Sequence, residues 1–264
     1  MDDRHISQTG LPHHSHDTSD AQEQSTNLNA ASHSGSASPS ESVLKAAAKI
    51  PILDVDGNEL LFEDLYKPSG PGKKKKRTLI IFIRHFFCGS CQEYVKAVSS
   101  SFSAPSQLPS DTAIAIVGCG ASSLIALYKD LTNCAFPVYT DPTKCLHALF
   151  DMKRTLYAGT RTPDYFSRSI FYLTIQSIVQ TLSRLWKGDM LQSGDKWQNG
   201  GELLFEAEII NETEDGEEEI EVQVPFSHIM ADTRNHTEIP VLRTILGLSE
   251  EQHGKSLKIG STTE

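Results

Sequence analysis

Two cysteines, Cys88 and Cys91, stand in the sequence RHFFCGSC, which directly follows a run of apolar residues. Only the thiolate form of cysteine attacks a peroxide or a disulfide, and a thiol with an ordinary pKa of about 8.5 is scarcely ionised at neutral pH. We expect Cys88 to begin a helix, where unpaired backbone N–H groups favour an anion, with Arg84 and His85 adding positive charge. Cys91, one turn further on and less exposed, is then the predicted resolving thiol of a local disulfide.

The alternative for this pair is two inert thiols in a reduced core. A zinc site is disfavoured because it takes about four ligands, and the other cysteines, Cys119, Cys134 and Cys145, are scattered singly without a second CxxC. Cysteine fills core positions like a small hydrophobic residue, so these three are interpreted as structural, with Cys119 at a strand end near the pair. The hypothesis is therefore a redox pair that needs no metal or other cofactor.

Three other features each have two interpretations. His228 and His236 are candidate proton relays to a leaving thiolate, but the favoured interpretation is exposed or hydrogen-bonded loop histidines. The basic run at residues 73–77, KKKKR, is a solvated loop before a strand or, less favoured, a nuclear-localisation pattern. An apolar segment at residues 169–186 is expected to pack over the sheet edge rather than to bind a partner or a membrane surface.

Apolar periodicity predicts the elements that position these residues. Residues 78–83 (TLIIFI) and 113–117 (AIAIV) are typical of strands buried on both faces of a parallel sheet. Helices are predicted at residues 43–49, 92–102, 121–131, 143–150, 169–186 and 238–246, short strands at 52–55 and 136–139, a mixed segment at 59–66, and a hairpin of residues 201–210 and 219–225. This order predicts an α/β, thioredoxin-like three-layer sandwich whose central mixed sheet has parallel first strands and an antiparallel hairpin.

Composition divides the chain of 264 residues into unequal parts. Residues 1–42 contain almost no large apolar side chains and cannot offset the entropy of ordering, which predicts a disordered N-terminal tail. Residues 43–248 are long enough to form one domain with its own core. Within that domain, residues 151–196 are interpreted as a helical insertion, and residues 249–264 are expected to form a flexible C-terminal tail.

Charge and cysteine content narrow the function classes. The net charge of −10 argues against nucleic-acid binding, and no run reaches the roughly 18 apolar residues of a membrane span. The N-terminus lacks the apolar segment of a secretory signal, and five cysteines, an odd number, fit a reducing compartment better than a disulfide framework. We expect a cytoplasmic location, with the nucleus as a second one if the basic run is a targeting signal.

Three further segments carry a resemblance to a known family. Residues 136–152 (FPVYTDPTKCLHALFDM) resemble the peroxiredoxin stretch in which a short strand enters an Asp-Pro turn before a helix. Residues 197–205 (WQNGGELLF) and 224–242 (VPFSHIMADTRNHTEIPVL) resemble the Gly-Gly strand and the His-bearing hairpin of peroxiredoxin-like AhpC/TSA antioxidant proteins, a thioredoxin-like branch related to selenoprotein U. The resemblance implies a thiol oxidoreductase that reduces a peroxide or a disulfide through Cys88 and Cys91, with thioredoxin or glutathione as reductant. The alternative is a thioredoxin-like binding or regulatory module without turnover.

The sequence departs from the PxxxTxxC pattern of typical peroxiredoxins. Ile81 and His85 stand at the Pro and Thr positions, so no Thr hydroxyl is expected to bond a peroxide. No arginine other than the neighbouring Arg84 is evident for lowering the thiol pKa, and Asn199-Gly200-Gly201 stands where thioredoxins have a cis-proline. These departures favour the binding module, whereas the intact CxxC at a helix start favours the enzyme.

Overall fold

The structure, a computed structural model, describes residues 37–102, 108–166, 192–212 and 218–248. The first half of the described chain contains α1 (Glu41–Ala48), β1 (Pro51–Leu53), β2 (Glu59–Leu61), the 3-10 helix η1 (Phe62–Leu65), β3 (Lys75–Phe82), α2 (Gly89–Ser101) and β4 (Thr112–Gly118). The second half contains the 3-10 helix η3 (Ser122–Leu124), α3 (Ile125–Thr132), β5 (Val138–Thr140), α4 (Cys145–Leu149), β6 (Gly201–Glu212), β7 (Glu218–Ile229) and α7 (Ile239–Ile245).

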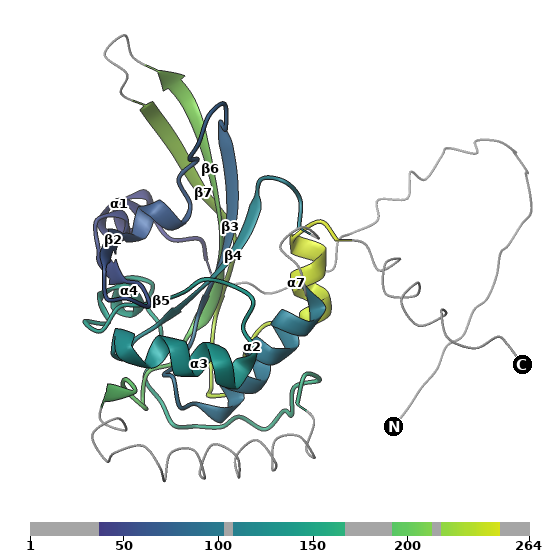
Figure 1. The fold of residues 1–264 in the computed structure, drawn as a ribbon. Coiled ribbons are helices and arrows are strands. Elements are labelled where there is room, and N and C mark those ends of the chain that lie inside the picture. Colours follow the sequence, from purple (N-terminus) through teal and green to yellow (C-terminus); the bar gives the residue numbers. More distant parts are fainter. Residues whose placement is uncertain (1–36, 103–107, 167–191, 213–217, 249–264) are drawn as a thin grey trace, which may run out of the picture. The chain divides into compact units, whose positions relative to one another are not determined.

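The strands of the described residues form one mixed sheet in the order β2-β1-β5-β4-β3-β6-β7 (Figure 1). β3, β4 and β5 run parallel, as the strand–helix alternation predicted. β6 pairs antiparallel with β3 and then with β7, and β1 and β2 add antiparallel strands at the opposite edge. The predicted mixed sheet with a terminal antiparallel hairpin is therefore confirmed.

β3 lies at the centre of the core because its apolar run serves both faces of the sheet. Leu79 and Ile81 pack with side chains of α2, α3 and α7, whereas Ile80 and Phe82 pack with those of α1, η1 and α4. All four side chains are fully buried, which is the alternation expected when helices cover both faces of a sheet. The two helical layers around the sheet, visible in Figure 1, confirm the thioredoxin-like three-layer α/β sandwich.

The folded unit begins earlier than the predicted boundary at residue 43. The Ser40 side chain accepts a hydrogen bond from the Val43 N–H and caps α1, which starts at Glu41. The Ser38 hydroxyl donates to the carbonyl of Val224 at 2.6 Å, so the chain before the helix also contacts β7. The prediction placed the boundary too late because the serine-rich segment resembles a polar tail, although serine is a preferred N-cap residue.

Several element bounds differ from prediction by a few residues. The mixed segment at 59–66 is β2 followed by η1, and the helix predicted at 121–131 divides into η3 and α3. α2 begins at Gly89 rather than at residue 92, so that Cys91 lies inside the helix. The helix predicted at residues 169–186 lies outside the described residues. No helix among those that are described has the length and apolar character needed to cross a membrane.

Candidate active site

The two cysteines lie where β3 gives way to α2. Cys88 is the N-cap residue of α2, in extended conformation, and its carbonyl accepts the N–H of Gln92 as the first turn begins. Both residues are buried, with 4% of the Cys88 surface and none of the Cys91 surface exposed. The sequence-based placement of Cys88 at the start of a helix and Cys91 one turn inside it agrees with this geometry.

The Cys88 sulfur lies among hydrogen-bond donors. The Arg84 guanidinium donates to it from Nη1 at 3.2 Å, and the Ser90 hydroxyl lies 3.2 Å away. The Ser90 hydroxyl has a single proton and also donates to the Thr233 carbonyl at 2.7 Å, so its proton is divided between two acceptors. The Nη1 donor of Arg84 is not divided in this way. This surrounding favours a sulfur that carries negative charge.

The pKa of Cys88 is held well below its ordinary value. The largest cause is a hydrogen bond from the Cys91 thiol; burial opposes it, and the charges of His85 and Arg84 and the Ser90 hydroxyl lower the pKa further. Burial also lowers the pKa of the neighbouring His85 imidazole, which is therefore mainly neutral at neutral pH. Arg84 thus supplies a positive charge beside Cys88 that does not depend on pH.

Arg84 is positioned by a segment that lies more than a hundred residues away in sequence. Its Nη2 donates to the Lys196 carbonyl at 2.6 Å, and its Nε lies 3.2 Å from both the Gln198 carbonyl and the Asn199 side-chain oxygen. Gly200 follows this segment, and a Cβ at that position would lie 1.8 Å from the Phe82 carbonyl oxygen. Only glycine permits this approach, so the Gly-Gly segment brings the carbonyls that orient the guanidinium against β3.

Cys91 has the opposite protonation preference. Burial, together with the hydrogen bond and negative charge of Cys88, raises the pKa of Cys91 well above its ordinary value. Its sulfur accepts the Arg84 backbone N–H at 3.4 Å and lies 3.4 Å from His236 Nε2. The pKa values of the two thiols are therefore shifted in opposite directions, and Cys88 is the thiol that ionises first.

A buried carboxylate and histidine complete the surroundings of Cys91. His236 Nδ1 lies 2.6 Å from Oε1 of Glu202, whose side chain, like that of His236, is fully buried. The other oxygen of Glu202 accepts the backbone N–H and the hydroxyl of Thr237 at 3.2 and 2.8 Å. The ring of Tyr94 stacks on the imidazole, with centroids 4.1 Å apart and planes 9° apart. His236 is thus a hydrogen-bonded loop histidine, as one form of the favoured expectation had it, but it is buried and lies against Cys91. Glu202 was not among the predicted site residues.

The comparison with protein families agrees with the sequence resemblance. Residues 74–213 match the family model described as AhpC/TSA antioxidant enzyme, a span that contains both cysteines and Glu202. The chain belongs to the AhpC/TSA antioxidant enzyme family.

Curated relatives of this AhpC/TSA family member include Peroxiredoxin-like 2C of Bos taurus, 26% identical over 165 residues that cover 61% of this chain and 66% of the relative. The Mus musculus Peroxiredoxin-like 2C is 27% identical with the same coverage, so the match spans just under two thirds of the length of either relative. Among solved structures, a peroxiredoxin-like protein from Aquifex aeolicus has a TM-score of 0.38 at 9% identity, covering 81% of this chain and 85% of its own. Xanthomonas campestris Peroxiredoxin Q has a TM-score of 0.32 at 15% identity, covering 42% and 63%.

The remaining cysteines of this AhpC/TSA family member are arranged less favourably for chemistry. Cys119 donates to the Arg84 carbonyl at 3.0 Å, and burial raises its pKa to about 11. Cys134 is buried near the Phe136 carbonyl, and burial raises its pKa too. Cys145 is exposed at the start of α4. Within the described parts of the chain, no group of three potential metal ligands converges.

The other sequence features lie apart from the cysteines. His228 Nε2 lies 2.7 Å from the Asn235 carbonyl, and His228 is paired with Glu202 across β6 and β7. The basic run is part of β3 rather than only a loop before it: Lys75 and Arg77 pair with Glu208 and Glu206 of β6 at 2.8 and 2.7 Å. Within β3, these cations therefore help to join two strands of the sheet.

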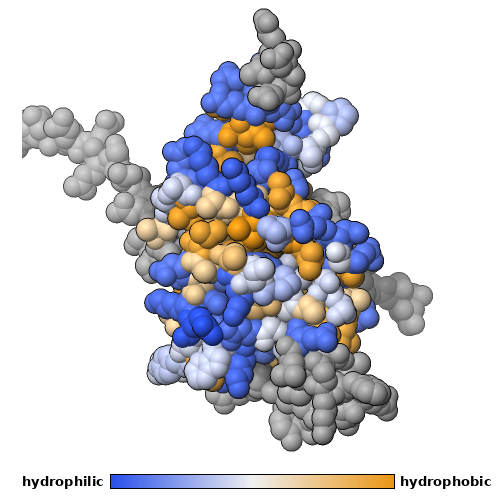
Figure 2. Space-filling model, turned by 90° about the vertical axis from the view of Figure 1, so that its left-hand side faces the viewer, coloured by the Kyte–Doolittle hydropathy of each residue, from blue (hydrophilic) through white to orange (hydrophobic). Residues whose placement is uncertain are grey.

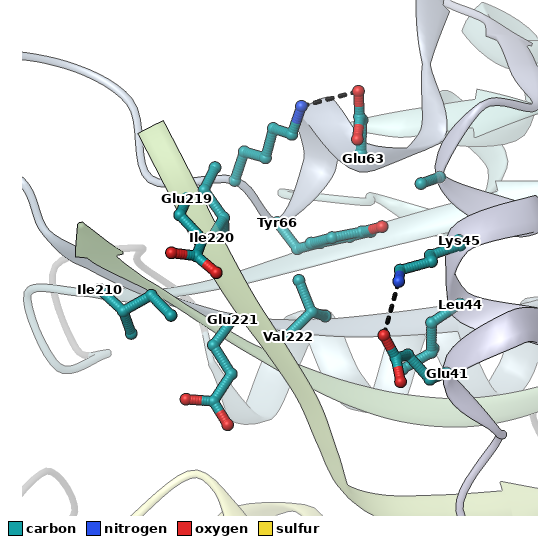
Figure 3. A pocket seen from close by; sticks show the side chains of 12 residues that line it. Glu41, Leu44, Lys45, Glu63, Tyr66, Ile210, Glu219, Ile220, Glu221 and Val222 are labelled. Atoms are coloured by element: carbon teal, nitrogen blue, oxygen red, sulfur yellow. Dashed lines mark ion pairs between the residues drawn. The ribbon is translucent and has the colours of Figure 1, made fainter. Parts of the chain in front are cut away.

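An open groove of about 740 Å³ lies between α1, η1 and the β6–β7 hairpin (Figure 3). Leu44 and Val222 contribute to its apolar lining, and the ion pair of Lys45 with Glu41 lies at its edge. Figure 2, which looks at the side of the molecule on the left of Figure 1, shows apolar surface gathered in a band between hydrophilic residues. The groove shares no lining residue with the surroundings of Cys88, so it is separate from the candidate active site.

Proposed function

We propose that this protein is a thiol-dependent antioxidant oxidoreductase that reduces a peroxide or a small disulfide through Cys88 and Cys91. The observation that carries the proposal is the contact of the Arg84 guanidinium with the Cys88 sulfur at the start of α2, beside a Cys91 that holds its proton. A thiolate and a thiol within one helical turn are the two reactants that a dithiol cycle needs.

In the first step, the Cys88 thiolate attacks one oxygen of the peroxide. A sulfur–oxygen bond forms, the oxygen–oxygen bond breaks, and the alcohol leaves after taking a proton, so that Cys88 becomes a sulfenic acid. With a disulfide as substrate, the same attack gives a mixed disulfide and releases one thiolate. Arg84 holds the attacking sulfur anionic in either case.

In the second step, Cys91 attacks the Cys88 sulfur. The new sulfur–sulfur bond displaces hydroxide, which leaves as water, or the substrate thiolate. The internal disulfide is then reduced by a dithiol protein of the thioredoxin class or by glutathione, which returns two electrons and two protons. We propose that the protein does this in the cytoplasm, where such reductants are abundant.

The substrate class depends on His85. The resemblance places His85 where typical peroxiredoxins have the threonine that bonds the peroxide. The His85 side chain is largely buried and the pKa of its imidazole is lowered, so it does not supply a second cation to the site at neutral pH. We therefore expect small disulfides to compete well with peroxide for Cys88.

The test is mild oxidation of the reduced protein by hydrogen peroxide or by glutathione disulfide, followed by thiol counting, intact mass and peptide mapping. We expect two thiols to disappear per chain and a Cys88–Cys91 disulfide within one chain. Cys91→Ser should instead accumulate a Cys88 sulfenic acid or mixed disulfide. Cys145→Ser is the matched control, because Cys145 is exposed and lies outside the pair.

Three results would overturn this mechanism. A covalent dimer through Cys88 would show that the second thiol comes from another chain. A Cys88–Cys119 disulfide would show that the resolving thiol is misassigned. Retention of all five thiols under mild oxidant would favour the binding or regulatory module.

A further inference from the structure

We propose that His236, held by Glu202, accepts the proton of Cys91 when Cys91 attacks the oxidised Cys88, so that Cys91, His236 and Glu202 form a proton relay for the resolving step. This inference rests on the proposed function, because the relay acts only if Cys91 closes a disulfide.

The hydrogen bonds around Glu202 fix the tautomer of His236. One oxygen of Glu202 accepts a hydrogen bond from Nδ1 of His236, and the other accepts two hydrogen bonds from Thr237. The carboxylate is therefore the acceptor in all three contacts. Burial disfavours the charge on Glu202, but the imidazole of His236 and the other donors keep its pKa below the ordinary value. With Nδ1 donating to the carboxylate, the neutral ring presents the lone pair of Nε2 to Cys91.

Nε2 of His236 is directed at the Cys91 sulfur. Nε2 lies 3.4 Å from the Cys91 sulfur, and the imidazole is fixed in plane by the stacked ring of Tyr94. A buried thiol with a raised pKa is a poor nucleophile until a base removes its proton. His236 is the imidazole base in direct contact with that sulfur, and its other ring nitrogen is held by Glu202.

The titratable groups around His236 come from several elements, and each of them could contribute to the pH dependence of the resolving step. They are Cys91 and Tyr94 of α2, Glu202 of β6, His228 of β7, and Tyr165 and Glu238 of the flanking segments. Burial raises the pKa of both tyrosines, which therefore stay neutral through neutral pH. The tyrosines therefore do not take part in proton exchange near neutral pH.

In the resolving step, the Cys91 proton moves to Nε2 of His236, the imidazolium is stabilised by the Glu202 carboxylate, and the Cys91 electron pair forms the bond to Cys88. The bond from Cys88 to its leaving group breaks, and the leaving group departs with that electron pair. His236 returns the proton to solvent or to the leaving group.

A chromogenic aryl disulfide separates this step from the first one. Attack by Cys88 releases one coloured aryl thiolate, and closure by Cys91 releases a second, so stopped-flow absorbance records both steps on one sample. The experiment uses the full chain with Cys145→Ser, which removes the exposed thiol that would add a third release. Cys91→Ser in the same chain gives the trace for the first release alone.

We expect His236→Gln to slow the second release about a hundredfold and Glu202→Gln to slow it about tenfold, within the range of general-base catalysis. The first release should keep its rate, which also shows that the variants are folded around Cys88. The pH profile is the sharper readout. With the relay, the second rate should rise less than tenfold per pH unit, because the attacking thiol does not ionise beforehand; in His236→Gln it should rise about tenfold per pH unit with the ionisation of Cys91. His147→Gln is the matched control, because His147 is also fully buried but contacts the Ile83 carbonyl.

Each outcome has a distinct meaning. A second release that rises about tenfold per pH unit in the parent chain would overturn the relay without any variant, which covers the case in which the substituted chains do not fold. Unchanged second rates in folded His236→Gln and Glu202→Gln would overturn it as well. If the parent chain gives no second release, the proposed dithiol function itself fails.

Discussion

The charge of Arg84 should set the reactivity of Cys88, and Arg84→Met tests this. Nη1 of Arg84 lies 3.2 Å from the Cys88 sulfur, and both side chains are nearly buried. At that distance, and at an effective dielectric constant of about 20, a guanidinium and a thiolate attract by about 5 kcal/mol. That is an upper bound of about 4 pH units, and opposite charges this close usually shift a pKa by about 1–3. We expect Arg84→Met to raise the pKa of Cys88 by about 1–3 pH units.

The measurement is the rate of alkylation of Cys88 by iodoacetamide as a function of pH, with the modified peptide quantified by mass spectrometry. Below both pKa values, the thiolate fraction of the variant should be lower by roughly ten- to a thousandfold. Arg84→Lys should fall between the two, because it keeps the charge but loses the planar fork that reaches the carbonyls of residues 196 and 198. Arg77→Met removes an arginine of β3 that pairs with Glu206, so its profile should match the parent.

The pH dependence of the free energy of unfolding gives a second, independent test of the role of Arg84. The pKa of Cys88 is lower in the folded chain than the value of about 8.5 in the unfolded chain. The thiolate therefore adds stability that is fully present above about pH 8.5 and is lost as the pH falls through the folded pKa. The free energy of unfolding that Arg84→Met removes should grow from acid toward that pH, on top of a constant loss from the unpaired carbonyls. An alkylation profile of Arg84→Met that coincides with the parent would refute the role of Arg84.

Two further predictions concern the frame of the site. Gly200→Ala should lower the free energy of unfolding by about 3 kcal/mol or more in urea titration, because its Cβ would lie 1.8 Å from the Phe82 carbonyl oxygen; an unchanged midpoint would show that the strands separate there at little cost. A chain that begins at residue 43 should lose about 1–2 kcal/mol relative to one that begins at residue 37, because it lacks the Ser40 cap and the Ser38 contact with β7; identical thermal melts of the two chains would contradict this.

The sequence was sufficient for features that depend on neighbours along the chain. The apolar runs at residues 78–83 and 113–117 predicted two central strands, because a strand covered on both faces must be apolar at every position. The placement of Cys88 at a helix start followed from the same local pattern. Bounds were less well predicted where capping decided them, as at Ser40, since a serine cap looks like part of a polar tail.

The second half of the site depends on contacts that no local pattern contains. Glu202 follows Gly201 in β6 and lies opposite Ile81 of β3, on the same face of its strand as buried Leu204. Period-two alternation therefore places a carboxylate at a core position, which is a signal that a buried partner must exist. The identity of that partner, His236, required the tertiary fold, because the two residues meet only after the hairpin has formed.

The asymmetry between the two sulfurs also gives the reaction an order. In the resting pair, the single Cys91 proton has two acceptors, the Cys88 thiolate and Nε2 of His236. Burial, and then the hydrogen bond to Cys88 and its charge, raise the pKa of Cys91, which makes Cys91 the weaker competitor for substrate. In the proposed cycle, oxidation turns Cys88 into a neutral sulfenic acid or mixed disulfide, which removes both effects and leaves burial as the main cause of the raised pKa of Cys91. The imidazole is then the remaining acceptor of the two. We therefore propose that oxidation of Cys88 makes Cys91 available to resolve it, so that the order of the two steps follows from the charge on the Cys88 sulfur.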